Sequence, residues 1–335
     1  MLSQTGTVPP GNRDRQATRA AAKKLDCAVP SAPIAVVANM MSGRMHDIVD
    51  THTHVISPDQ VRYPLAPVGG RQSDWSAHHS TDDDALLTEM DEAGIARAMV
   101  VQASTAYGND NRYVADAVRA HPDRFGGVFS IDMLADDNVD QMRRWMDAGL
   151  SGLRIFTTGT TMPGQADWLD DERTFPVWEY AQRHGVSICV QMTAAGIPRL
   201  INLVTRFPGV RVLLDHLARP NLADGPPYES AASLFDLAAH TGVYLKLTNR
   251  TIREAARGAS TPAAFFPRVV AAFGAQRIAW GSNYPAAEGT LAALLVEATN
   301  ALSVLSDSER AWIFGDTART IYPALNDAPR AGMRV

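Results

Sequence analysis

The chain has 335 residues, of which 46% are hydrophobic and 20% charged, a balance that excludes a wholly disordered protein. Lys and Arg total 31 against 36 Asp and Glu, and the resulting net charge of −5 argues against a nucleic-acid or anionic-membrane binder. The two cysteines are too few for a disulfide scaffold or a cysteine-rich zinc site, so we expect a soluble, cytoplasmic protein.

The first 45 residues differ in composition from the rest. They carry six basic and two acidic residues, and prolines interrupt them. Their longest apolar run, residues 32–41, is about half as long as a membrane span, so no membrane segment is expected. We predict a disordered leader over residues 1–45, or a start codon assigned too early, then one domain over 46–325 and a flexible tail over 326–335.

From residue 46 onward, short β-rich runs alternate with longer amphipathic runs. The predicted strands are 47–53, 98–103, 126–131, 152–156, 186–192, 210–215, 243–248 and 278–281. The predicted helices lie near 83–94, 111–120, 137–148, 172–184, 197–206, 230–240, 262–273 and 289–304. Consecutive apolar residues, as in 187–192, are typical of parallel strands covered on both faces.

Eight such alternations predict an α/β protein, a closed (β/α)₈ TIM barrel with a single domain. An open doubly wound sheet is the alternative. No Gly-x-Gly-x-x-Gly sequence follows the first strand, which argues against the dinucleotide-binding form of that sheet.

The carboxyl ends of barrel strands face the active site, so functional residues are expected at those ends. The first strand ends in Asp50-Thr-His-Thr-His54. Because alternate residues of a strand point the same way, His52 and His54 share one side, with Asp50 one step deeper. Two neighbouring imidazoles can bind a metal or polarise a carbonyl group. A pair of capping or surface histidines is the alternative.

The sixth and eighth strands bring further polar residues to the same end. The sixth ends at Asp215 and His216, with Arg219 just beyond, although an Asp–His helix-capping turn would give the same sequence. The eighth ends at Asn283, whose amide can hold substrate or water but cannot act as a general base.

Three arginines are predicted to approach the same rim: Arg154, Arg219 and Arg250. Guanidinium groups match carboxylates bidentately, which favours an anionic substrate. For each arginine alone, a surface charge or a salt bridge at the bottom of the barrel is the alternative. The remaining substrate-binding candidates are Gln102, Ser104 and Lys246.

These residues together resemble the amidohydrolase-related superfamily, and more narrowly its lactonase branch, which includes the 2-pyrone-4,6-dicarboxylate lactonases. The resemblance runs from about His46 to Pro323. The sequences that carry it are Asp50-Thr-His-Thr-His54, Val101-Gln-Ala-Ser104, Asn109-Asp-Asn111, Gly152-Leu-Arg154, Leu214-Asp-His-Leu-Ala-Arg-Pro220, Lys246 and Trp280-Gly-Ser-Asn-Tyr-Pro285.

The resemblance implies a distorted barrel that hydrolyses a cyclic ester, often a product of aromatic-compound degradation. In the pyrone lactonases no metal is required; histidines polarise the lactone carbonyl, arginines hold carboxylates, and an eighth-strand Asp activates water. His52, His54 and His216 match the histidines. Arg154 and Arg219 match arginine positions, and Arg250 does so approximately.

Two departures from that pattern bear on the mechanism. The fifth strand ends Gln191-Met-Thr193 and lacks the histidine of metal-dependent relatives. Asn283 replaces the water-activating Asp, so the base is left open among Asp50, Asp215, a histidine, or a divalent ion that lowers the pKa of water. An altered or lost reaction is a further alternative.

We therefore expect a hydrolase that opens a small carboxylated lactone, either 2-pyrone-4,6-dicarboxylate-like or muconolactone-like. For this function no cofactor is required. The expected partner is the small anionic substrate, and a homo-oligomer is possible. One alternative is a hydrolase of a cyclic amide or another ester, with zinc or manganese held by His52, His54 and His216. The other is a catalytically silent barrel that binds organic acids.

Overall fold

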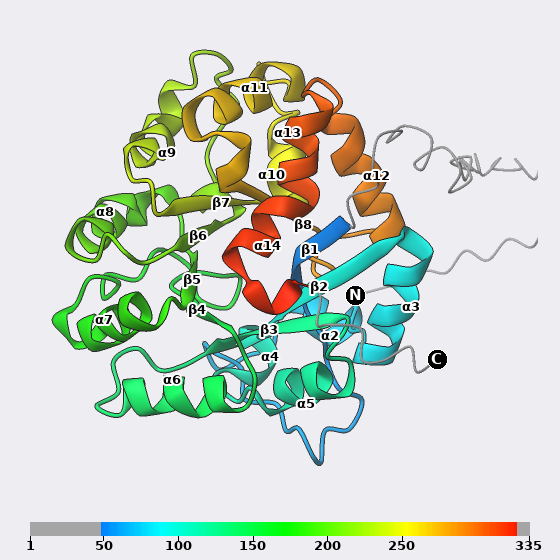
Figure 1. The fold of residues 1–335 in the computed structure, drawn as a ribbon, viewed down its shortest axis with the longest axis vertical. Helices are drawn as coiled ribbons and strands as arrows, with labels where there is room; N and C mark the ends of the chain where they lie inside the picture. The colour runs from blue at the N-terminus through cyan, green and yellow to red at the C-terminus, as the bar shows by residue number, and fades with distance from the viewer. Residues whose placement is uncertain (1–47, 327–335) are drawn as a thin grey trace, which may run out of the picture.

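The computed structural model describes residues 48–326, and it contains the predicted barrel (Figure 1). The leader predicted over 1–45 lies outside the described residues, as does all but the first residue of the tail predicted over 326–335. The eight strands are β1 (Ile48–Thr53), β2 (Ile95–Val101), β3 (Phe125–Ser130), β4 (Gly152–Phe156), β5 (Ser187–Gln191), β6 (Val212–Asp215), β7 (Val243–Thr248) and β8 (Ile278–Gly281). Each pairs in parallel with the next in chain order, and each overlaps a predicted strand.

β1 and β8 lie side by side and bring the ends of the sheet together. The Thr51 hydroxyl donates to the Trp280 carbonyl at 2.7 Å. Beyond the end of β8, the Asn283 N–H donates to the His52 carbonyl at 2.8 Å, and the His54 N–H donates to the Tyr284 carbonyl at 2.8 Å. These bonds tie the residues after β8 to the histidine pair of β1.

Helices follow every strand around the outside of the barrel (Figure 1). The longer ones are α3 (Asp83–Ala93), α5 (Arg112–Ala120), α6 (Asn138–Asp147), α7 (Phe175–His184), α8 (Ile197–Arg206), α11 (Pro262–Phe273) and α12 (Leu291–Ala301). Each of these was predicted within a few residues. The helix predicted over 230–240 is shorter, since α9 covers only Ala232–Asp236 between two 3₁₀ turns.

Short helices are absent from the sequence prediction because four to six residues give no helical periodicity. They are α2 (Asp74–His78), α4 (Ser104–Tyr107), α10 (Asn249–Glu254) and α13 (Asp307–Ala311). The first three lie in loops that follow the carboxyl ends of β1, β2 and β7. The last helix, α14 (Thr317–Ile321), lies where the family resemblance places a terminal helix. Within residues 48–326, no helix combines the length and apolar character that a membrane crossing requires.

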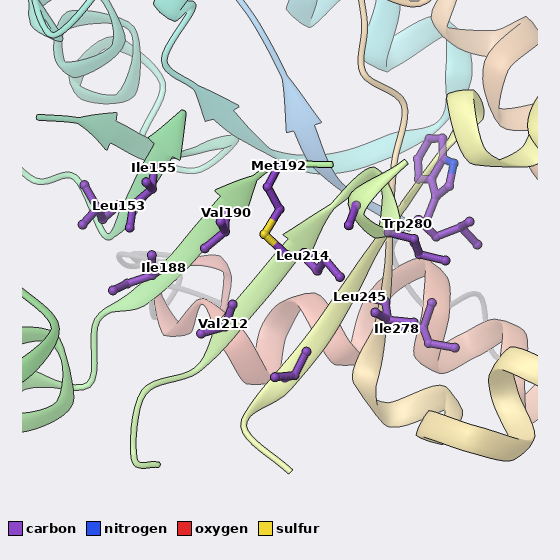
Figure 2. Packing of buried hydrophobic residues seen from close by; sticks show 14 of the residues in the cluster. Leu153, Ile155, Ile188, Val190, Met192, Val212, Leu214, Leu245, Ile278 and Trp280 are labelled. Carbon is purple, nitrogen blue, oxygen red and sulfur yellow. The ribbon is translucent and has the colours of Figure 1, made fainter. Parts of the chain in front are cut away.

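Alternate residues of each strand pack outward against the helices. Figure 2 shows this layer for β4 to β8, where Leu153, Ile188 and Leu214 belong to one buried cluster. The inward residues in between divide into two groups. At the amino ends of the strands, the side chains of Val49, Leu213 and their neighbours pack with the C-terminal segment that includes α14 and Tyr322. The polar inward residues are therefore left at the opposite, carboxyl end.

Gly281 permits the close approach of β8 to β1. A Cβ atom added there would lie 2.7 Å from the His52 Cβ and 2.9 Å from the His52 backbone nitrogen, closer than such atoms can approach. We predict that Gly281→Ala lowers the free energy of unfolding by about 1–3 kcal/mol, as overpacking of a core does. Urea denaturation of both proteins measures this difference.

Gly126→Ala is the matched control inside the same barrel. Its added Cβ would meet the Met99 side chain, with Sδ at 2.5 Å, and this flexible thioether can move aside. The control should lose clearly less stability than Gly281→Ala. Equal losses would mean that the β1–β8 contact is not the constraint.

Candidate active site

A buried cluster of charged and polar side chains fills the carboxyl end of the barrel. Its centre is Asp215 at the end of β6, which is fully buried. Lys246 Nζ of β7 lies 3.0 Å from Asp215 Oδ1, and Arg154 Nε of β4 donates to Oδ2 at 3.3 Å. His52 Nδ1 lies 3.7 Å from Oδ1. One carboxylate thus joins the ends of four strands.

The charges of this cluster offset one another. Burial alone would raise the pKa of the Asp215 carboxyl, but Lys246 and Arg154 outweigh it and hold that pKa below its ordinary value. Burial acts to lower the pKa of Lys246, and Asp215 overcomes it, so the amine stays protonated. Two cations and one carboxylate leave an excess positive charge in the cluster.

Three imidazoles lie against this positive cluster. The ring centroid of His52 is 4.9 Å from that of His54 and 5.2 Å from that of His216. Burial, and then Lys246, place the pKa of His52 well below its ordinary value. Burial and Arg154 lower the pKa of His54 to about 3, and burial lowers that of His216 to about 3 despite Asp215. All three rings are therefore neutral near pH 7.

The hydrogen bonds of the three rings differ. His54 Nδ1 lies 2.7 Å from the Val101 carbonyl oxygen, and His216 Nδ1 lies 2.7 Å from the Thr248 hydroxyl. Both nitrogens of the His52 ring are buried without a protein partner among residues 48–326. Unpaired buried polar atoms cost free energy, so His52 marks a place where a water or substrate atom would bind.

His216 stands on a left-handed turn. His216, Leu217, Ala218 and Arg219 have φ values of 53°, 53°, 57° and 54°, although none is glycine. This conformation costs roughly 1–2 kcal/mol per residue. Strain of this kind is tolerated where it places functional side chains, and here it aims His216 and Arg219 at the same space.

An open cavity of about 570 Å³ adjoins the buried cluster. Residues after β6, β7 and β8 line it, among them His216, Arg219, Arg250 and Asn283. The mouth of the barrel is the open end that the carboxyl ends of the strands surround. The loop between β1 and α3 covers the side of this mouth opposite the cavity, where the Val68 N–H donates to the Ser104 carbonyl at 2.9 Å. Access to the cluster is therefore from the β6–β8 side.

Two of the four cavity arginines have carboxylate partners. Arg253 forms a fork with Glu297, at 2.9 Å from Nε to Oε1, and Arg257 pairs with Glu254 at 3.3 Å. Arg219 and Arg250 have no carboxylate partner within residues 48–326. Arg219 is partly buried, and burial together with Arg250 lowers its pKa to about 10. These two guanidinium groups are free to receive an anion from solution.

The other predicted residues lie elsewhere in the mouth. Arg154 and Lys246 contact Asp215 inside the barrel and do not line the cavity. Asp50 accepts the backbone N–H groups of His52 and Ser282, each at 2.9 Å, and so holds β1 against the end of β8.

Gln102 and Ser104 are buried away from the cavity. The Gln102 amide donates to the carbonyls of Gly108 and Asp110, and the Ser104 hydroxyl bonds the Ser130 hydroxyl at 3.3 Å. Neither residue has a polar contact with the Asp215 carboxylate.

Sequence reasoning missed two contacts of the histidines. Thr248 lies two residues beyond Lys246 on β7, so strand alternation alone places both on the same side. Trp75 of α2 stacks on His54 with ring centroids 5.0 Å apart. No pattern in the sequence indicated that contact, because α2 is too short to give a periodicity.

The donor set does not fit a metal centre held by His52, His54 and His216. Within residues 48–326, no group of three His, Cys, Asp or Glu side chains is placed to hold a metal ion. Of the two buried aspartates beside the histidines, Asp215 is already paired with Lys246 and Arg154, and Asp50 accepts two backbone N–H groups. These fixed cations would also repel a divalent ion.

Comparison with known proteins places these observations in a family. Residues 49–324 match the family model described as amidohydrolase. The L-fucono-1,5-lactonase of Burkholderia ambifaria is 26% identical over 197 residues, which span 58% of this chain and 66% of that protein, just under two thirds of its length.

Solved structures share the fold at low sequence identity. A Pseudomonas putida structure provisionally described as a 2-pyrone-4,6-dicarboxylic acid hydrolase has a TM-score of 0.69 and 20% identity, covering 85% of this chain and all of that one. A zinc-bound amidohydrolase from Burkholderia multivorans has a TM-score of 0.65 and 21% identity, covering 82% of this chain and 99% of that one.

The buried histidines predict acid sensitivity. The unfolded chain binds protons on His54 and His216 below about pH 6.5, whereas the folded chain does not until about pH 3. The free energy of unfolding should therefore be highest above pH 6.5 and fall by about 1.4 kcal/mol per pH unit for each such histidine as the pH drops. Urea denaturation at about pH 7, 5.5 and 4.5 measures this slope.

His216→Asn is the control, because asparagine tolerates a positive φ. It should reduce the slope by about 1.4 kcal/mol per pH unit. A slope that this variant leaves unchanged would contradict a neutral, buried His216.

Proposed function

Because the chain belongs to the amidohydrolase family, we propose that it is a hydrolase that opens a small carboxylated lactone. The observation that carries the proposal is the cavity that joins His216 to the unpaired Arg219 and Arg250. The cavity thus offers an imidazole for a reacting carbonyl and two guanidinium groups for a carboxylate. The relative from Burkholderia ambifaria, a lactonase, supports the same reaction class.

The reaction places negative charge on the carbonyl oxygen when water attacks the lactone. Hydrogen-bond donors aimed at that oxygen in a site shielded from water stabilise the tetrahedral intermediate. His216 faces the cavity, and Arg154 and Lys246 lie behind the histidines with an excess positive charge. Both features favour a developing oxyanion over the neutral ground state.

The arginine pair selects the substrate class. Arg219 and Arg250 would bind a carboxylate on the ring by paired N–H···O bonds. Ring opening creates a second carboxylate, which the same positive rim accommodates. A lactone with a carboxylate, such as 2-pyrone-4,6-dicarboxylate or a muconolactone, therefore fits this cavity better than a neutral sugar lactone.

The first test is hydrolysis of a panel of lactones, carboxylated and neutral, before and after exhaustive chelation. We expect turnover of at least one carboxylated lactone that survives chelation, because the cluster does not present a three-ligand metal site. Turnover that disappears on chelation and returns with added zinc or manganese would contradict hydrolysis without a metal ion. Absence of turnover on the whole panel would contradict the proposed function.

A second test compares an arginine without a carboxylate partner with one that is already paired. Arg250→Ala should raise KM for a carboxylated lactone by about tenfold or more, the cost of one charge-assisted hydrogen bond of about 1.5–3 kcal/mol. Arg257→Ala lies on the same cavity, but its guanidinium pairs with Glu254, so KM should change little. Equal effects of the two changes would rule out a specific role for Arg250.

A further inference from the structure

Lactone hydrolysis requires a group that takes a proton from water, and the carboxylates of the mouth are poorly placed for it. Asp215 is fully buried between two cations, and Asp50 holds two backbone N–H groups. Of the two glutamates that line the cavity, Glu254 is paired with Arg257, and Glu288 is exposed to solvent at the rim. The amide of Asn283 is not basic. The imidazoles are what remains at the centre of the mouth.

The hydrogen bond of His54 fixes its tautomer. The partner of Nδ1 is the Val101 carbonyl oxygen at 2.7 Å, and a carbonyl can only accept. Nδ1 therefore carries the hydrogen, and Nε2 carries the lone pair. Nε2 has no protein partner within residues 48–326. The stacked Trp75 ring, with centroids 5.0 Å apart, holds the imidazole in this orientation.

The hydrogen bond of His216 fixes the opposite tautomer. Its Nδ1 lies 2.7 Å from the hydroxyl of Thr248, which is fully buried and has no other partner for its side chain among the described residues. If His216 donated, the Thr248 hydroxyl hydrogen would be buried and unpaired, at a cost of about 1–3 kcal/mol. The hydroxyl therefore donates to Nδ1, and Nε2 of His216 carries the hydrogen toward the cavity.

We infer that His54 is the proton acceptor for the attacking water, and that Thr248 is the positioning residue that makes His216 a hydrogen-bond donor to the lactone carbonyl. This assignment rests on the proposed function and names the groups that perform it. The His52 ring lies beside both of the other rings, and neither of its nitrogens has a hydrogen-bond partner among the described residues. His52 can therefore bind a water molecule between His54 and His216.

The proposed step is the attack of a water molecule on the lactone carbonyl carbon with His54 as the base. Burial and Arg154 hold the pKa of the resting His54 at about 3, and the negative charge that forms on the substrate beside it raises that pKa during the step. His54 Nε2 takes a proton from water while the water oxygen bonds to the lactone carbonyl carbon, and the carbonyl oxygen becomes an oxyanion bonded by His216 Nε2–H. The ring C–O bond then breaks, and the leaving oxygen takes the proton back from His54. The product is a hydroxy acid whose new carboxyl group loses its proton to solvent.

The test compares hydrolysis with attack by hydroxylamine, a nucleophile that needs no general base. His54→Gln keeps a polar side chain without a base, and hydrolysis should fall by about 10²-fold or more. Enzyme-catalysed formation of the hydroxamate, measured above the spontaneous rate, should fall much less. His216→Asn leaves no donor at the position of Nε2, because the shorter amide reaches only about as far as Nδ1. Both reactions should therefore fall by about 10²-fold or more.

Thr248 tests the tautomer directly. Thr248→Val removes the hydroxyl at nearly constant shape, whereas Thr248→Ser keeps it. In ¹⁵N NMR of the wild-type imidazoles, His216 should show a protonated Nε2 and His54 a protonated Nδ1. Thr248→Val should change the His216 signals and lower kcat rather than raise KM, and Thr248→Ser should restore both.

Three results would overturn the inference: equal losses of hydrolysis and aminolysis in His54→Gln, hydrolysis that survives in that variant, or NMR signals with the tautomers reversed. The proposed function fails separately, because a wild-type chain without any lactone turnover would still report its tautomers by NMR. Circular dichroism and urea denaturation of each variant identify those that fail to fold.

Discussion

The mouth of this barrel depends on the ion pairs of one buried carboxylate. Asp215 contacts Lys246 and Arg154, and all three side chains are almost completely buried. Burying any of these charges alone would be prohibitive, so each requires the others. Because they come from β6, β7 and β4, their mutual attraction holds three strand ends in register. Burial keeps the imidazoles neutral by lowering the pKa of each ring, and the positive charge of Lys246 and Arg154 behind the histidines acts in the same direction.

This cluster is also connected to the bottom of the barrel. Lys246 Nζ donates to Cys189 Sγ at 3.2 Å, and the same sulfur lies 3.1 Å from the Tyr322 hydroxyl. Tyr322 belongs to the C-terminal segment that packs into the amino ends of the strands. A continuous chain of polar contacts therefore runs from the C-terminal segment to Asp215.

The sequence predicted the barrel well because its strands are buried on both faces and its longer helices repeat with a clear period. It also predicted that His52, His54, His216 and Asp215 lie at the carboxyl end of the barrel, because strand alternation and barrel geometry suffice for that prediction. The sequence could not show which arginines are paired with a carboxylate and which are not. Arg154 meets a carboxylate 61 residues away, whereas Arg219 and Arg250 meet none among the described residues. Such pairings depend on packing between distant strands, and no local spacing encodes them.

The left-handed turn could not be predicted either, because it continues from His216 through Leu217, Ala218 and Arg219, which ordinarily avoid a positive φ. Packing overrides that preference: Leu217 and Ala218 are buried in the core, and the Thr248 hydroxyl holds the His216 ring. Burial of Leu217 and Ala218 on one side of the turn therefore offsets the strain. On the other side, the strained backbone places His216 and Arg219 at the cavity. The replacement of an expected carboxylate by Asn283 fits this arrangement, because an added negative charge would compete with the substrate for the arginines that the strained turn presents.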